Sequence, residues 1–145
     1  MDAEAKSSVI RRVEFARSEL SDLRAYLTLD FETYNSDRVL RRNVERIIEN
    51  AANSVCDIGK IVLSQHDTPM PESYRDVFLK LGELRFISPD LAESLALVTR
   101  LRNVLAHQYL DIKWDYIRRF MDHDVESIYA LLKAAEAWAV PCMGP

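Results

Sequence analysis

Apolar residues recur every three or four positions over most of the chain. One such stripe consists of Val9, Val13, Ala16, Leu20, Leu23 and Leu27, and the next of Leu40, Val44, Ile47, Ala51, Val55, Ile58 and Val62. This spacing places the apolar side chains on one face of an amphipathic α-helix. The segment TLDFETYNS interrupts the pattern and offers Asn35 or Ser36 as an N-cap. We therefore expect a first helix up to Leu27 and a second of roughly 28 residues over about 36–63.

The second half of the chain has the same helical period in shorter pieces. HDTPMP (66–71) predicts a loop, residues 72–84 a short helix, and Ser88-Pro89 the start of another, with serine as N-cap and proline in the first turn. Tyr116 to Phe120 predict a turn of helix, and a last helix follows from Val125 to Trp138. No segment alternates with period two. The pattern thus predicts an all-α fold, a bundle of four main helices plus short helical pieces.

Composition narrows the class of protein. The chain has 145 residues, which suits one domain, and only three glycines and five prolines, which favours long regular elements. The net charge of −4 argues against a general polyanion binder, so any nucleic-acid contact needs a local basic patch. Cys56 and Cys142 lie far apart and suggest no disulfide framework, as in a reducing cytoplasm. We expect neither a signal peptide nor a membrane segment.

Several familiar chemistries have no motif here. The sequence contains no glycine-rich phosphate loop, HExxH, CxxC or GxSxG, so it predicts no cofactor. No histidine pair has metal-ligand spacing, and we interpret Asp122-His123-Asp124 as a solvated turn, because neighbouring helical residues point apart. Cys56 sits in an apolar stripe and is expected in the core. The sequence therefore predicts no metal site.

The stretch RLRNVLAHQYLD (100–111) places polar residues inside an apolar run. At 100° per residue, Arg102 falls about 20° from Leu91, on the core-facing seam. A guanidinium there needs a carboxylate such as Glu45 or Glu49, or it lines a cleft that meets a ligand or a second subunit. In the first case His107 merely caps a helix C-terminus. Arg102 and His107 diverge by about 140°, so they converge only if the helix ends near residue 106 or two copies meet across a two-fold axis.

Arg102, Asn103, His107 and Tyr109 form an R-x4-H-x-Y pattern. With the blocks around it, this pattern resembles the HEPN-domain toxins of the HepT group in MNT–HEPN toxin–antitoxin systems. The likeness covers roughly residues 8–138 of a single domain, 1–145. The resemblance implies a metal-independent endoribonuclease that acts as a homodimer, with Arg102 and His107 of both protomers in one cleft and Asn103 in support. It also implies a nucleotidyltransferase antitoxin that transfers AMP to Tyr109.

The chemistry of these side chains suits RNA cleavage. His107 can act as general base or acid, Arg102 can clamp phosphate oxygens, and Asn103 can orient the imidazole. An AMP group on Tyr109 would block the site by charge and volume, although this tyrosine could instead simply close the core after the helix. Candidate contacts to the RNA, whether tRNA or mRNA, are arginines at helical spacing: Arg38, Arg42 and Arg46. They could equally form a solvated face paired with Glu45 and Glu49. The alternative function is a non-catalytic HEPN module that serves a nucleotidyltransferase as partner or substrate-positioning subunit.

Overall fold

The structure is a computed structural model that describes residues 2–140. Its elements are α1 (Ala3–Leu23), η1 (Arg24–Tyr26), α2 (Phe31–Ser36), α3 (Arg38–Ser64), α4 (Tyr74–Glu83), α5 (Pro89–Val98), α6 (Leu101–His107), α7 (Leu110–Arg119), η2 (Phe120–Asp124) and α8 (Val125–Ala139). Within this range there is no strand, which confirms the predicted all-α fold. Cys142 lies outside the described residues.

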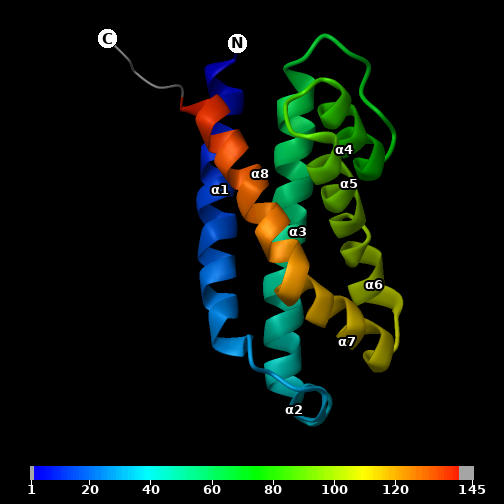
Figure 1. Ribbon diagram of the computed structural model, residues 1–145. Coiled ribbons are helices and arrows are strands. Elements are labelled where there is room, and N and C mark those ends of the chain that lie inside the picture. The colour runs from blue at the N-terminus through cyan, green and yellow to red at the C-terminus, as the bar shows by residue number, and fades with distance from the viewer. Residues whose placement is uncertain (1, 141–145) are drawn as a thin grey trace.

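The long helices form the body of the bundle. Helices α1, α3 and α8 run alongside one another, and α4, α5 and α6 cover the other side of α3 (Figure 1). Helix α3 is the central element and contributes the largest share of the buried side chains. Its Gly59 lets α4 approach closely, since a Cβ at this position would lie 2.6 Å from the ring of Phe78. No helix within residues 2–140 is long and apolar enough to cross a membrane.

Side-chain caps fix where several helices begin. Ser88 caps α5 by accepting the Leu91 N–H, and Pro89 occupies the first turn, as predicted. The predicted cap of α3 was wrong: Asp37 accepts the Leu40 N–H, because Asn35 and Ser36 already belong to the short helix α2.

The first helix ends before its apolar stripe does. The helical turn expected at 116–120 is part of a longer helical segment. Helix α1 ends at Leu23, and a 3₁₀ turn carries Leu27 away from the core, leaving it 44 % exposed. Helix α7 begins at Leu110 and continues through the π-helical turn η2 into α8.

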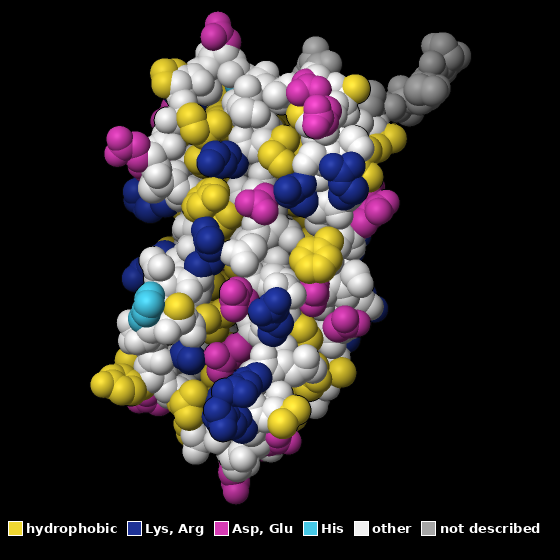
Figure 2. All heavy atoms as spheres, turned by 180° about the vertical axis from the view of Figure 1, so that it is seen from behind, with side chains coloured by type: hydrophobic (Ala, Val, Ile, Leu, Met, Phe, Trp, Pro, Cys, Tyr) yellow, Lys and Arg dark blue, Asp and Glu magenta, His cyan; other side chains and the backbone are white. Residues whose placement is uncertain are grey.

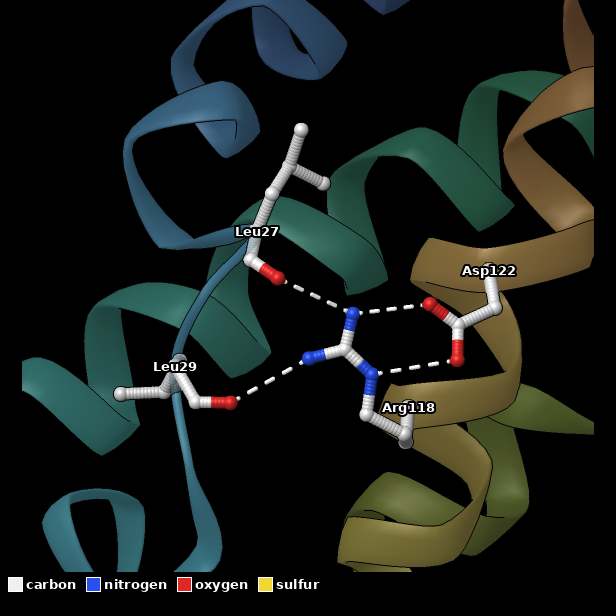
Figure 3. A network of polar contacts seen from close by, with 4 residues as sticks. All are labelled: Leu27, Leu29, Arg118 and Asp122. Carbon is white, nitrogen blue, oxygen red and sulfur yellow. Dashed lines mark hydrogen bonds and ion pairs between the residues drawn. The ribbon is translucent and has the colours of Figure 1, made fainter.

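Polar contacts hold α7 against the bundle. Glu45 of α3 accepts a hydrogen bond from the Tyr34 hydroxyl at 2.6 Å and pairs with Lys113 of α7 at 3.2 Å. Burial and the Glu45 carboxylate raise the pKa of Tyr34 above its usual range. The Arg118 guanidinium bonds the carbonyls of Leu27 and Leu29 and the Asp122 carboxylate (Figure 3). Arg118 therefore ties the loop before α2 to the end of α7.

Candidate functional site

Helix α6 is separated from α5 by a tightened turn at Thr99 and Arg100. The Thr99 hydroxyl donates to the Ala96 carbonyl at 2.6 Å, a local bond that competes with regular helix geometry. The Arg100 N–H bonds the Leu97 carbonyl, and the Asn103 N–H bonds the Arg100 carbonyl. Both are i→i+3 bonds, the spacing of a 3₁₀ turn.

This turn rotates the side chains of α6 about the helix axis, relative to their positions in one continuous α-helix. Three residues at 3.0 rather than 3.6 residues per turn advance the helix by roughly 60° more than a regular α-helix does. The rotation brings Leu101, Val104 and Leu105 to the core and leaves Arg102 exposed. The expectation that Arg102 occupies the core-facing seam was therefore wrong, because it assumed one uninterrupted helix.

Arg102 stands beside a tyrosine and over a buried thiol. Its Cζ lies 5.4 Å from the centre of the Tyr74 ring, within the range of a cation–π contact. Burial raises the pKa of the Cys56 thiol to about 11, although the Arg102 guanidinium acts in the opposite direction. Cys56 is thus a protonated core residue, as its apolar stripe predicted.

The carboxylates proposed as partners do not pair with Arg102. Glu45 is engaged by Tyr34 and Lys113. Glu49 lies on the wall of the same pocket as Arg102, but among residues 2–140 no carboxylate comes within 4 Å of the guanidinium. The sequence left two interpretations of Arg102, an arginine paired with a carboxylate in the core and an arginine that lines a cleft. The structure agrees with the second.

The cleft is a pocket of about 540 Å³ between α3, the start of α4 and the start of α6. Its lining consists of Glu49, Asn53, Glu72, Ser73, Tyr74, Arg75, Thr99, Arg100, Arg102 and Asn103. Of these residues, Arg102 and Asn103 were predicted from the sequence as site residues. Nothing in the sequence places Asn53 of α3 or Arg75 of α4 next to α6, because these contacts are long-range.

His107 and Tyr109 lie at the other end of α6. The helix ends at His107, and Gln108 adopts extended backbone with φ −96° and ψ 163°, so the predicted end near residue 106 is confirmed. Tyr109 then occupies the N-cap position of α7 and is 80 % exposed, which rules out the alternative that it closes the core. His107 is exposed too, but it does not line the pocket that contains Arg102.

The arginines of α3 form a separate basic surface. Arg38, Arg42 and Arg46 are exposed and, within the described chain, none has a carboxylate within 4 Å. The alternative that they pair with Glu45 and Glu49 is therefore not observed. Arg41, by contrast, donates to the carbonyls of Tyr34 and Asn35 and serves the fold. Figure 2 shows Lys and Arg side chains over much of one face, interleaved with acidic ones.

The histidines away from α6 are not grouped with other ligand side chains. His66 bonds the Val62 carbonyl through Nδ1 at 2.9 Å, and His123 is exposed in η2. Residues 2–140 contain no cluster of three or more His, Cys, Asp or Glu side chains arranged to hold a metal ion.

Solved structures with a similar fold come from toxin–antitoxin complexes. A chain of a mutant MntA–HepT toxin–antitoxin complex aligns with a TM-score of 0.79 and 20 % identity, covering 90 % of this chain and 98 % of that one. A structure of the tri-AMPylated Shewanella oneidensis HEPN toxin with its MNT antitoxin aligns with a TM-score of 0.68 and 19 % identity, covering 94 % and 98 %. At this identity the likeness establishes the fold.

Sequence comparison goes further than fold. The chain is 27 % identical over 101 residues to the tRNA nuclease HepT of Aphanizomenon flos-aquae, covering 70 % of this chain and 69 % of the relative. It is 23 % identical over 108 residues to the mRNA nuclease HepT of Shewanella oneidensis, covering 74 % and 81 %. Residues 16–135 match the model of a family described as ribonuclease HepT-like. This match spans most of the chain, including α6 and its exposed polar residues, and the protein belongs to the ribonuclease HepT-like family.

Proposed function

We propose that this protein is the ribonuclease toxin of a toxin–antitoxin pair. Two relatives carry the names tRNA nuclease and mRNA nuclease, and the similar solved structures are toxin–antitoxin complexes. The observation that carries the proposal is the outer surface of α6 and the turn behind it. Arg102, Asn103, His107 and Tyr109 are all exposed there, while the opposite face of the helix is buried.

These side chains can cleave RNA by acid–base chemistry, without a metal ion. His107 takes the proton from a ribose 2′-hydroxyl, which attacks the adjacent phosphate, or returns a proton to the leaving 5′-oxygen. Arg102 binds the phosphate oxygens and stabilises the charge that develops on them, because a guanidinium can donate two parallel hydrogen bonds. Asn103 supports this pair by orienting the imidazole or the phosphate.

A homodimer completes the site. In one chain, Arg102 faces the pocket beside Tyr74, and His107 stands at the far end of α6, outside that pocket. Two copies that pack with their α6 helices facing one another would bring the arginine of one chain toward the histidine of the other. Two histidines in one cleft would also supply both the base and the acid. The arginines of α3, Arg38, Arg42 and Arg46, extend the surface that contacts RNA.

A nucleotidyltransferase antitoxin controls the site through Tyr109. A similar solved structure contains an AMPylated toxin together with its MNT antitoxin. Tyr109 is two residues from His107 and fully available to an incoming enzyme. AMP on its hydroxyl adds a bulky anion next to His107 and, in the proposed dimer, next to the Arg102 of the other chain, which opposes the approach of RNA.

The test compares RNA cleavage by the wild-type protein with that by Arg102→Ala and His107→Ala. Arg11→Ala and His123→Ala serve as matched controls, because both residues are exposed on other elements. With tRNA and mRNA substrates in the presence of EDTA, we expect each site variant to lose at least about a hundredfold in rate and each control to retain full activity. Circular dichroism confirms that all variants are folded.

Three results would contradict the proposal or a part of it. Wild-type protein that is folded, free of AMP and inactive on all RNA would favour a non-catalytic partner of the transferase. Cleavage that survives both site substitutions would show that α6 is not the active site, and cleavage abolished by EDTA would exclude the metal-independent mechanism.

A further inference from the structure

We propose that the pocket between α3, α4 and α6 binds one nucleotide of the RNA chain, with its phosphate against Arg75 and Arg100 and next to the phosphate that Arg102 holds. This inference rests on the proposed ribonuclease function and identifies where the substrate is held next to the reacting groups. It adds Arg75, Arg100, Tyr74 and Asn53 to the binding surface.

The lining of the pocket is unusual for a protein of this composition. About half of the chain is apolar, yet none of the ten lining residues is aliphatic, and Tyr74 provides the one aromatic ring. Apolar side chains dominate the usual pocket for a small organic ligand. A wall of guanidinium, amide and hydroxyl groups instead fits a ligand that is charged and rich in hydrogen-bonding atoms. The volume of about 540 Å³ lies within the range of sites for such ligands.

The charges favour an anion. Three arginines face two carboxylates, Glu49 and Glu72, around the pocket. Arg75 has an exposed carboxylate partner, Asp76, at 3.5 Å, while no carboxylate in the described chain pairs with Arg100 or Arg102. The pocket also receives the N-terminus of α4, whose dipole adds to the positive potential. The protein as a whole has a net charge of −4, whereas arginines outnumber carboxylates among the residues that line the pocket.

Two further side chains suit the base of a nucleotide. Single-stranded RNA is recognised by stacking of its bases on aromatic rings or guanidinium planes and by hydrogen bonds to base edges. The Tyr74 ring and the Arg102 guanidinium beside it provide such a platform. The Asn53 Oδ1 is buried without a hydrogen-bond partner in the part of the chain that the structure describes. If the amide turns toward the pocket, an N–H group of a base can satisfy this acceptor.

The position of the pocket links it to the reaction. Arg102 and Asn103 belong both to the pocket wall and to the exposed surface of α6. A nucleotide bound by Arg75 and Arg100 therefore continues directly to the phosphate that Arg102 holds. The pocket would select and position the nucleotide that flanks the scissile bond.

The experiment measures binding separately from cleavage. All variants are made in the His107→Ala protein, so that a short fluorescein-labelled single-stranded RNA stays intact during the titration. Arg75→Ala and Arg100→Ala are compared with Arg11→Ala, an arginine of α1 outside the pocket. Arg75→Lys and Arg100→Lys test whether charge alone is sufficient, and we expect each to bind RNA more weakly than wild type and more tightly than the corresponding alanine variant. Adenosine 5′-monophosphate and inorganic phosphate are titrated in parallel as free ligands.

We expect each pocket variant to weaken RNA binding roughly tenfold, the loss of one charge-assisted hydrogen bond, while Arg11→Ala binds normally. The slope of log Kd against log salt should also fall by about 0.7 for each lost phosphate contact. RNA affinity that is unchanged in both pocket variants, or equally reduced by Arg11→Ala, would overturn the proposal. So would an arginine-dependent affinity for free AMP with no effect on RNA, which would assign the pocket to a free nucleotide.

The same series separates this inference from the proposed function. If the wild-type protein does not cleave RNA but Arg75→Ala and Arg100→Ala weaken RNA binding, the ribonuclease proposal fails and the nucleotide pocket remains. If the wild-type protein cleaves RNA, and Arg75→Ala and Arg100→Ala neither weaken RNA binding nor, in protein that retains His107, change the KM of cleavage, the pocket inference fails alone.

Discussion

Tyr109 is the only exposed tyrosine among the six in the chain, all of which lie in the described range. The other five tyrosines are buried or half-buried, and the Tyr34 hydroxyl already donates a hydrogen bond to the Glu45 carboxylate. Exposure at the N-cap position of α7 also leaves the Tyr109 hydroxyl clear of the helix backbone. At the scale of single residues, the fold therefore offers one phenol for enzymatic modification.

Substitution of Tyr109 tests whether AMP transfer to this residue regulates the protein. We expect intact-mass measurement, after incubation with ATP and the nucleotidyltransferase antitoxin, to show increments of AMP on the wild-type protein and none on Tyr109→Phe. The variant should still cleave RNA, because it lacks only a hydroxyl on the surface, and it should resist inhibition by the antitoxin. Tyr129→Phe is the control and should be modified normally. AMP on Tyr109→Phe, or its absence on the wild-type protein, would contradict this part of the account.

Among the elements, the turn between α5 and α6 decides the orientation of the site. The sequence predicted one helix from Pro89 onward, and the wheel built on Leu91 placed Arg102 in the core. The Thr99 hydroxyl and two i→i+3 bonds tighten the helix and rotate Arg102 outward. A threonine and an arginine are ordinary helix residues, so nothing in the local sequence signals this rotation.

Other features could be predicted where the physical signal is local. Ser88 and Pro89 mark the start of α5 correctly, and the apolar stripe of α3 predicts its length within a few residues. The helix end at His107 followed from the geometry that the motif required. The pocket could not be predicted, because it depends on α3, α4 and α6 meeting in space, with Asn53 and Tyr74 brought to Arg102.

The acidic residues of the η2 turn behave differently from one another, although the sequence suggested a single solvated turn. Asp122 is exposed and bonded to Arg118, which lowers its pKa. Asp124 is buried, and burial raises its pKa despite the opposing charges of Arg119 and His123. A raised carboxyl pKa means that ionisation of Asp124 costs stability at neutral pH, and that this cost disappears as the pH falls through the folded-state pKa.

Thermal unfolding against pH tests this contrast. Asp124→Asn should raise Tm at neutral pH, and its advantage over wild type should shrink as the pH falls through the raised pKa of Asp124 toward the unfolded-state pKa of an aspartate. Asp122→Asn should do the opposite: it lowers Tm at neutral pH, and the difference vanishes as the pH falls through the lowered pKa of Asp122. If the Tm of the two variants depended on pH in the same way, burial would not shift the pKa of Asp124 away from that of Asp122.

Over the whole molecule, two groups of arginines lie near the candidate site, those that line the pocket beside α6 and those on the exposed face of α3. The pocket lies between α3, the start of α4 and the start of α6, and Arg38, Arg42 and Arg46 lie in the N-terminal part of the long helix α3 (Figure 1). One chain nevertheless separates Arg102 from His107 along a helix of seven residues. We therefore propose that the working site is shared between two copies.

Complementation between two inactive variants tests most directly whether the site is shared between two chains. Arg102→Ala and His107→Ala chains are co-expressed with different tags, and the mixed dimer is purified through both tags and assayed for RNA cleavage. We predict that each pure variant is inactive and that the mixed dimer regains part of the activity, because one arginine and one histidine then meet across the interface while the second histidine of the cleft is missing. A mixed dimer as inactive as its parents, beside an active wild-type protein, would show that each chain uses its own pair and would contradict the shared site.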